Sequence, residues 1–450
     1  MVVGVKFLRQ GVSRSPDVPN AVRESCHRQM VAPLPRNMTP RILLLQGPVG
    51  PFFGRLRRFL NAAGIETWQV VFNAGDRLFA GFGGRTLVYS KGLEKWEDWL
   101  AQQVIEGQFN QIVLFGSERP VHAIARKVAA SLNLPVISLE EGYIRPGAIT
   151  LERGANNSLS PIAGKLPPPG FSADSLERPQ QSKSSFLPIC LFGATYYTVA
   201  VVFSRRRQRE MLHRPIRLVA DAVSWVQNFF RRLTTQLSNV AVVERLLEHH
   251  VGQYFVVPLQ VSDDTQLKAA ALGWNNARLI RESIQSFALT APRHMRLVFK
   301  IHPLECERNE YRRLVRQLAK EFGVEDRVDL IEFGSIGHLT RHSAGMITIN
   351  STSGLSAIHH GVPLLVIGNA LYANPELATC ARGEPDFSAF WKGAHVADAA
   401  LRKRYLAWVW HECLRPGDFY TREGIDLACA AVADAITSHF VSSKGLSEAA

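Results

Sequence analysis

The sequence predicts an α/β protein with two Rossmann-like, doubly wound domains that face a cleft, followed by a helical C-terminal tail. Two observations support this prediction. Short apolar, β-rich runs alternate with segments of helical periodicity, once before residue 150 and again after residue 254. A stretch rich in Pro, Ser and Gly, about 151–185, separates the two units and is expected to be a loop. Alternating strands and helices are typical of a parallel sheet covered on both faces.

The first unit alternates strands with two clear helices. A helix is expected at about Phe53–Ala63, because Gly64 supplies a common terminator. A second is expected within "VHAIARKVAASLN", whose apolar residues recur at helical spacing. The predicted strands are Arg41–Gln46, Thr67–Phe72, Gln111–Gly116 and Leu134–Gly142.

The second unit repeats this alternation. Helices are expected near Leu279–Leu289 and Glu310–Phe322, and the tail from about Phe387 to Phe440 has helical character. The predicted strands are Tyr254–Gln260, Arg296–Lys300, Val328–Phe333, Ala344–Asn350 and Pro363–Gly368.

These elements divide the chain into five predicted parts. The first is expected to be a disordered extension, because it mixes Arg, Pro and Ser without a continuous apolar run. The parts are the extension (1–38), the N-terminal Rossmann-like domain (39–185), a basic amphipathic helical linker that contacts the membrane (186–250), the C-terminal Rossmann-like domain (251–386) and the helical tail (387–450).

Composition limits the classes of function. The 450 residues carry a formal net charge of +13, which favours anionic partners such as phosphorylated substrates or an acidic membrane surface. Nucleic acid is not expected, because no groove-reading motif accompanies the charge. Six cysteines are scattered without a CxxC pair, as in a reduced cytosolic protein, and predict neither a zinc site nor a disulfide framework. No secretory signal is recognised, so a cytoplasmic location is expected.

The segment after the loop suggests membrane contact. Phe186–Phe203 is uncharged and is followed by "RRRQR". Beyond it, a helical stripe of apolar residues lies among clustered arginines, which suits the headgroup region of an anionic bilayer. The alternatives are an interdomain helix packed on the core and a transmembrane helix. The stripe consists of Val219, Val223, Val226, Phe230, Leu233 and Leu237.

Polar clusters follow five of the predicted strands. In a doubly wound sheet they would all lie at the carboxyl edge, where ligands bind. In one of them, Ser351–Ser353 offers three successive hydroxyls before a helical segment, which favours phosphate binding over ordinary helix capping. The clusters are Gly47–Gly50, Gly116–Arg119, Glu140–Tyr143, Lys300–Pro303 and Asn350–Gly354.

Two clusters contain candidates for chemistry. His302 is positioned to bind the same phosphate, and Lys300 would reinforce the positive potential. One carboxylate of Glu140 and Glu141 is expected to face the cleft, because successive residues of a strand point in opposite directions. It would act as base or nucleophile; the alternative is a pair of loop acids bound to Arg145 or Arg153.

Long motifs resemble one family. The plan of two Rossmann-like units is shared with GT-B-type glycosyltransferases and some epimerases, so fold alone does not select a function. The motifs "LLLQGPVGPFF", "LFGSERPVHAIA", "EEGYIRP", "FKIHPLE" and "INSTSGLSAIHHGVPLLVIGNALY" are similar to those of capsular polysaccharide synthesis and export proteins of KpsS type. Such proteins are bacterial β-Kdo transferases, Kdo being 3-deoxy-D-manno-oct-2-ulosonic acid. The resemblance spans about 39–420, although Asn374–Pro385 departs from the family pattern.

The resemblance implies an activity and its partners. Members transfer Kdo from CMP-β-Kdo to a phosphatidylglycerol-type lipid, with retained configuration, at the cytoplasmic face of the inner membrane. They act beside a second Kdo transferase and the capsule-export machinery. Neither a cofactor nor a metal is implied, and no Asp-x-Asp element is present where a metal-dependent transferase would need one. Asp263-Asp264 is a weak metal candidate.

The resemblance also assigns residues. Retention implies a double displacement through a glycosyl-enzyme, with Glu141 as nucleophile, and His302 lies at the CMP phosphate. The predicted substrate-binding residues are Gly47, Glu140, Arg145, Gln260, Asp263, Lys300, Pro303, Ser351, Thr352 and Ser353.

Two alternatives remain open from the sequence. One is a non-catalytic capsule-export scaffold at the inner membrane, and the other is a GT-B-like enzyme that uses a different nucleotide sugar.

Overall fold

A computed structural model describes most of the chain. The described residues are 39–81, 85–172, 186–212, 239–262, 264–303, 305, 308–381 and 383–448. The predicted extension 1–38, the apolar stripe from Val219 to Leu237, and Asp263 therefore lie outside the described residues.

The N-terminal lobe is built on a seven-stranded sheet with the order β13-β6-β5-β4-β1-β2-β3. Neighbouring strands from β3 to β5 pair in parallel, whereas β6 and β13 are antiparallel additions. Read from β3 to β6, the order is that of a Rossmann fold. The strands are β1 (Arg41–Leu44), β2 (Glu66–Val71), β3 (Arg85–Val88), β4 (Gln111–Phe115), β5 (Val136–Glu141), β6 (Ala148–Arg153) and β13 (Leu414–Pro416).

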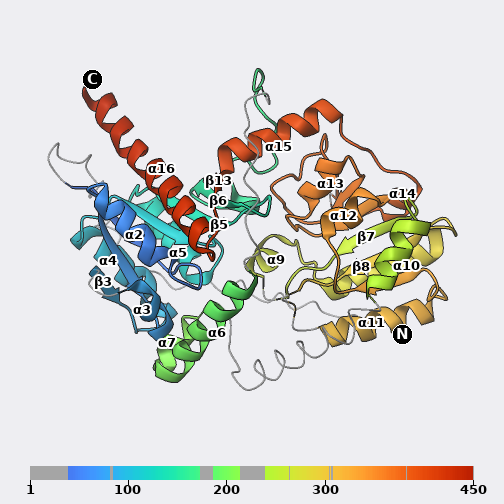
Figure 1. The fold of residues 1–450 in the computed structure, drawn as a ribbon, viewed down its shortest axis with the longest axis horizontal. Helices are drawn as coiled ribbons and strands as arrows, with labels where there is room; N and C mark the ends of the chain where they lie inside the picture. The colour runs from blue at the N-terminus through green and yellow to red at the C-terminus, as the bar shows by residue number, and fades with distance from the viewer. Residues whose placement is uncertain are drawn as a thin grey trace, which may run out of the picture.

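The C-terminal lobe repeats this order in a fully parallel sheet, β12-β11-β10-β7-β8-β9. The strands are β7 (Tyr254–Pro258), β8 (Arg296–Lys300), β9 (Val328–Ile331), β10 (Gly345–Thr348), β11 (Leu364–Val366) and β12 (Thr379–Cys380). The predicted fold of two doubly wound domains is confirmed, and Figure 1 shows the two lobes side by side.

Alternation along β1 explains how helices cover both faces of the N-terminal sheet. Ile42 and Leu44 pack beneath α2 (Phe52–Ala62) and α16 (Arg422–Glu448), whereas Leu43 and Leu45 point to the other face. That face is covered by α4 (Trp96–Glu106) and α5 (Pro120–Ser131). Because both faces are buried, the strand is apolar throughout.

The C-terminal lobe is covered in the same way. On one face, Phe255 and Val257 pack against α10 (Asn276–Thr290), α11 (Arg308–Glu321) and α14 (Phe387–Lys392). On the other face, Val256 and Met346 contact α13 (Gly354–His360) and α15 (Ala399–Cys413). The shorter helices are α9 (Thr265–Ala270) and α12 (Ile336–Arg341), and residues 239–249 are also helical.

The predicted helical tail joins the two lobes. In Figure 1, α15 crosses from the C-terminal lobe toward the N-terminal lobe, where β13 pairs with β6 and α16 packs on α2. Arg55 of α2 donates to Asp426 of α16 at 2.7 Å. The core around α13 and α15 also includes Tyr143 and Ile162 of the N-terminal lobe, so the lobes share buried apolar contacts.

The structure adds a strand within the region expected to be loop. Ala148–Arg153 forms β6, whose Glu152 is buried. The remaining elements are two 3₁₀ turns, η1 (Leu93–Lys95) and η2 (Asn157–Leu159), and the helices α3 (Ala74–Ala80), α6 (Phe186–Phe203) and α7 (Arg206–Glu210). Over the described residues, no helix combines the length and apolar character that a bilayer crossing requires.

Candidate active site

The N-terminal lobe has a topological switch point between β1 and β4, where ligands bind in such folds. Arg119, at the start of α5, bridges it by donating to the Gln46 side chain at 3.2 Å and to the Gly47 carbonyl at 3.3 Å. A side chain at Gly47 would meet the Phe53 ring at 2.8 Å, so glycine is required for this close approach. Burial lowers the pKa of Arg119, against the opposing effect of nearby Tyr197 and Tyr196.

Glu140 is the more desolvated of the two carboxylates at the end of β5. It is half-buried and accepts a 2.7 Å hydrogen bond from Asn157 of η2. Burial, followed by the negative charges of Asp264 and Glu152, raises the pKa of Glu140 to about 8. The side chain is therefore mainly protonated at neutral pH. Since Asp264 precedes α9, this carboxyl group faces the C-terminal lobe.

Glu141 lies in a more polar environment. Its carboxylate is 3.9 Å from the Arg145 guanidinium and accepts a hydrogen bond from the Tyr420 hydroxyl. Tyr420 follows β13, so it reaches the site only because β13 pairs with β6. The sequence contained no local signal for this contact.

The C-terminal lobe has its own switch point, between β7 and β10. Here the bridge is a pair of amides: Gln260 donates to the Asn350 side chain at 2.9 Å, and the Asn350 backbone N–H donates to Gln260 at 3.3 Å. Gln260 is buried, and its own backbone N–H donates to Asn276 at 3.2 Å. The predicted site residue Gln260 thus holds the start of the serine-rich loop.

The serine-rich loop is braced from within and from behind. Ser351 donates through its hydroxyl to Ser353 at 3.1 Å, and the Tyr372 hydroxyl donates to the Ser351 carbonyl. Tyr372 packs so closely on Gly354 that an added Cβ would lie 2.2 Å from it. Within the described part of the chain, the Ser353 side chain makes no capping bond to α13. Helix capping therefore does not account for this hydroxyl.

His302 follows β8 and faces the other lobe. It is half-buried, and its pKa is lowered to about 4 by burial and then by the positive charges of Arg145, Lys300 and Arg308. The contribution of Arg145 comes from the N-terminal lobe. β8 and β10 both pair with β7, so their ends are separated by two strand spacings, about 10 Å. His302 and Ser351 accordingly flank one strand end.

Lys300 lies beneath the His-Pro turn. It is buried, and its pKa is lowered to about 8 by burial and by Arg308, against the opposing charge of Glu332. Pro303 is exposed, and its carbonyl accepts a hydrogen bond from Arg308. The turn is thus surrounded by cationic groups. Among the described residues, no cluster of three His, Cys, Asp or Glu side chains is suited to hold a metal ion.

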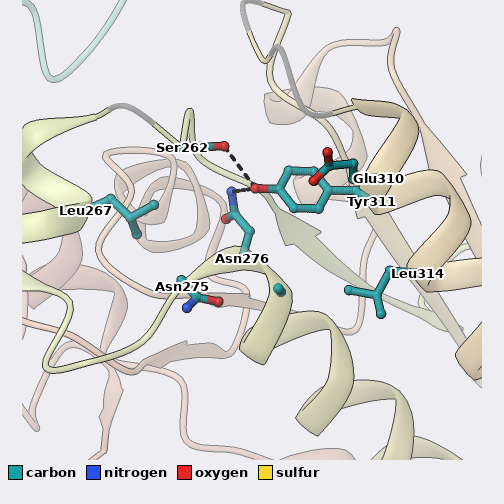
Figure 2. A pocket seen from close by; sticks show the side chains of 8 residues that line it. Ser262, Leu267, Asn275, Asn276, Glu310, Tyr311 and Leu314 are labelled. Atoms are coloured by element: carbon teal, nitrogen blue, oxygen red, sulfur yellow. Dashed lines mark hydrogen bonds between the residues drawn. The ribbon is translucent and has the colours of Figure 1, made fainter. Parts of the chain in front are cut away.

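A cavity of about 500 Å³ adjoins the C-terminal switch point. Figure 2 shows Ser262 and Asn276 converging on the Tyr311 hydroxyl, at 2.9 and 3.2 Å. Asn276 also donates to the Gln260 carbonyl at 2.7 Å. These polar groups bond to one another and support the chain after β7, so we place the chemistry in the cleft instead of this cavity.

Two lines of contact show that the sheet edges face each other. The charge of Asp264 in the C-terminal lobe raises the pKa of Glu140 in the N-terminal lobe. In the other direction, the charge of Arg145 in the N-terminal lobe lowers the pKa of His302 in the C-terminal lobe. α9 also contacts η2, and Figure 1 shows α9 between the lobes. The structure thus places the acidic cluster at one sheet edge, and the His-Pro turn and the serine-rich loop at the sheet edge that faces it. Sequence analysis missed Tyr420, Tyr372 and the bridging role of Arg119.

The comparisons place the chain among capsule proteins. Residues 110–420 match the family model described as capsule polysaccharide biosynthesis protein. The chain is 30% identical to the capsule polysaccharide export protein KpsS of Escherichia coli, over 82% of this chain and 94% of that protein. It is 29% identical to the capsule polysaccharide modification protein LipB of Neisseria meningitidis serogroup B, over 85% and 92%. The predicted resemblance is confirmed.

Solved structures are more distant. The β-Kdo 2,7 transferase of Thermosulfurimonas dismutans KpsC aligns with a TM-score of 0.39 and 14% identity, covering 82% of this chain and 89% of that one. A similarity of this size says nothing about substrate or reaction.

Proposed function

The chain belongs to the capsule polysaccharide biosynthesis family, and we propose that it is a retaining β-Kdo transferase. It would take Kdo from CMP-β-Kdo and add it to a phosphatidylglycerol-type lipid, starting the linker of a capsule. The observation that carries this proposal is the opposition of two sheet edges, one presenting a carboxylate pair and the other a cationic, hydroxyl-rich turn. A nucleotide sugar needs a phosphate site and a carboxylate at opposite ends of the scissile bond.

The C-terminal lobe would hold the donor. His302 and the hydroxyls of Ser351, Thr352 and Ser353 would bind the CMP phosphate, with Lys300 adding positive potential from beneath. Because a bound phosphate adds negative charge near His302 and Lys300, it would raise the pKa values that burial now depresses. That gain favours binding of an anion and stabilises the charge that develops on the leaving phosphate.

The N-terminal lobe would supply the two carboxyl groups of a double displacement. In this scheme the Glu141 carboxylate, which lies beside Arg145 and Tyr420, attacks the anomeric carbon as the bond from that carbon to the phosphate oxygen breaks. Glu140, protonated at neutral pH, gives its proton to the departing phosphate. In the second step Glu140 takes the proton of the acceptor hydroxyl, whose oxygen displaces Glu141. The double inversion retains configuration.

The acceptor and location follow from the same proposal. The acceptor is an anionic phospholipid, so the protein would work at the cytoplasmic face of the inner membrane, beside a second Kdo transferase and the export machinery. No metal or cofactor has a role in this scheme, because the carboxylates and cationic groups supply the acid–base chemistry and the charge stabilisation.

The test is mass spectrometry of phosphatidylglycerol incubated with the full-length protein and CMP-Kdo generated in situ. A Kdo-bearing lipid with β configuration, accompanied by CMP release, is expected. If CMP stabilises the protein against heat but no Kdo is transferred, another CMP-sugar is the donor. If CMP gives no stabilisation either, the protein is a non-catalytic scaffold or an enzyme for a nucleotide sugar without CMP, because a ligand of the native state must raise its stability.

A further inference from the structure

Helix α6 is apolar on opposite faces. Its inner face packs against α3, where Tyr196 and Ala200 are buried and the rings of Phe192 and Phe79 lie 5.9 Å apart. Its outer face carries large apolar side chains that contact solvent. Leu187, Leu191, Val202 and Phe203 are between 56% and 74% exposed.

Three of the exposed residues, Leu187, Leu191 and Val202, lie on one side of the helix, and Phe203 adjoins Val202 at its C-terminal end. Leu187 and Leu191 are four residues apart, and exposed Ala194 and Thr198 continue the same side of the helix to Val202. Single exposed apolar residues are ordinary on a protein surface, but a stripe along one helix indicates an interaction surface. Packing among the residues that the structure describes explains the inner face of α6 and leaves the outer face unexplained.

Charge identifies the kind of partner. Arg205, Arg206, Arg207 and Arg209 follow the stripe directly, at the start and along the length of α7, and all four are exposed. The acidic side chain of Glu210 offsets part of this positive charge, and its carboxylate lies 3.9 Å from the Arg206 guanidinium. Clustered arginines repel a second copy of the same surface, whereas they attract the phosphates of anionic lipids. Apolar side chains beside arginines match the boundary between acyl chains and headgroups.

We propose that the outer face of α6, together with the arginines of α7, docks on an anionic lipid bilayer. An 18-residue helix is about 27 Å long, and its stripe lies along its side, so it would lie in the plane of the membrane surface. The docking surface is thus Leu187, Leu191, Val202, Phe203, Arg205, Arg206, Arg207 and Arg209.

A buried polar anchor connects this helix to the N-terminal switch point. The Tyr196 hydroxyl donates to Asp76 at 2.8 Å and accepts hydrogen bonds from Gln46 at 3.1 Å and Asn73 at 3.0 Å. Gln46 also accepts from Arg119, which bridges β1 and β4. Phe192 lies against Gly50, in the loop that follows β1. Docking of α6 would therefore hold the edge of the N-terminal sheet at a fixed position relative to the lipid surface.

The docking surface is argued from α6 and α7 alone. The inference rests on the proposed function in one respect, namely that docking would bring the two facing sheet edges to a lipid acceptor. Figure 1 shows α6 at the lower edge of the N-terminal lobe, with one end toward α9 and the space between the lobes. The sequence had placed the membrane-contact stripe mainly at Val219 to Leu237, outside the described residues. The docking surface proposed here is separate from that stripe.

The first experiment is flotation of the full-length protein with vesicles of phosphatidylcholine, with or without phosphatidylglycerol. Wild type is expected to bind vesicles that contain phosphatidylglycerol. Leu191→Ser combined with Phe203→Ser should weaken binding about tenfold, since two large apolar groups no longer enter the lipid. Arg206→Glu combined with Arg207→Glu should weaken binding by a similar factor, and added salt should reduce the affinity of wild type and of the apolar double variant more than that of this charge-reversed variant.

The controls use exposed positions elsewhere. Leu289→Ser alters an exposed leucine of α10 in the C-terminal lobe and should leave vesicle binding unchanged. All substituted side chains are exposed, so thermal unfolding temperatures should match wild type. If the α6 and α7 variants float as wild type does, the proposal is wrong. It is also wrong if they change the oligomeric state without changing vesicle binding, because the face would then be a protein interface.

A second readout separates this inference from the proposed function. The α6 double variant should still transfer Kdo to a short-chain phosphatidylglycerol kept below its micelle concentration, and should lose transfer to vesicles. If wild type binds vesicles but transfers Kdo to neither acceptor, the proposed function fails and the docking surface stands. If the variant transfers to vesicles as well as wild type does, α6 is not how the lipid surface is engaged.

Discussion

The two lobes share one strand order but bridge their switch points with different chemistry. In the N-terminal lobe a cation, Arg119, joins the ends of β1 and β4, close to two carboxyl groups and several phenols. In the C-terminal lobe two neutral amides, Gln260 and Asn350, join the ends of β7 and β10. A neutral bridge adds no charge next to Lys300 and the neutral His302, whereas a cationic bridge offsets part of the negative charge of its own edge. The same fold thus creates two differently charged edges, to which we assign acid–base chemistry and anion binding in the proposed function.

Replacing Glu141 at the N-terminal edge should have the largest effect. Glu141→Gln removes the nucleophile while leaving a hydrogen-bonding side chain beside Arg145, so Kdo transfer should fall by roughly 10³-fold or more. CMP binding, which belongs to the other lobe, should remain near wild type. The measurement is CMP release together with CMP-induced thermal stabilisation.

The matched control is Glu106→Gln, at an exposed glutamate of α4 on the same lobe. It should behave as wild type. Full transfer by Glu141→Gln would show that the edges do not divide the chemistry in this way.

The pH dependence of Kdo transfer should reveal the role of Glu140. Because its pKa is about 8 in the folded protein, above the ordinary value of 4.5, its proton is present below pH 8 and is lost as pH rises through that value. Transfer that needs this proton should decline with a midpoint near pH 8. Glu140→Gln should lower the rate by about 10²-fold and remove that decline.

The pH dependence of the free energy of unfolding tests the raised pKa of Glu140 independently. The folded state binds it more tightly than the unfolded chain, so the stabilisation is complete below pH 4.5 and is lost as pH rises to about 8. Urea unfolding of wild type should show this loss, and Glu140→Gln should flatten that part of the profile. Equal profiles for the two proteins would refute the assignment of the raised pKa to Glu140.

The C-terminal edge is tested by two histidines at opposite ends of one strand. His302 follows β8, and exposed His294 precedes it. His302→Ala should weaken CMP binding by roughly tenfold, since a hydrogen bond to a charged phosphate is lost. His294→Ala should bind CMP as wild type does. Titration calorimetry of the full-length protein measures both, and equal losses would mean that the anion site is not at the carboxyl edge.

The smallest effect on CMP affinity is expected from replacing Gln260, one of the two amides that bridge β7 and β10. Gln260→Ala removes both hydrogen bonds to Asn350 without touching the phosphate, so the serine-rich loop should lose order and CMP affinity should fall about threefold to tenfold. Gln102→Ala, at an exposed position of α4, is the control. A loss of Kdo transfer without any loss of CMP affinity would show that Gln260 serves the acidic edge instead.

Local pattern was sufficient for the parallel strands and insufficient for the antiparallel ones. Strands such as β1, β4 and β8 are apolar runs that end in polar clusters, so their positions and carboxyl edges could be predicted. β6 follows a turn, lies beside a Pro- and Ser-rich stretch and was predicted as loop from Leu151 onward. β13 has three residues and pairs with β6 only after the chain has passed through the C-terminal lobe. Neither strand carries a local signal, because long-range pairing specifies them.

The sequence by itself determined the two-lobed fold and the clusters at the strand ends, since periodicity and strand termini are local properties. It could not determine that the pKa of Glu140 is raised. Neighbouring residues of a strand point in opposite directions, and a pKa depends on the groups within a few ångströms of each side chain. Asp264, which raises the pKa of Glu140, and Tyr420, which lies beside Glu141, are far away in the chain. Only the docking of the second lobe and the return of the C-terminal segment bring them there.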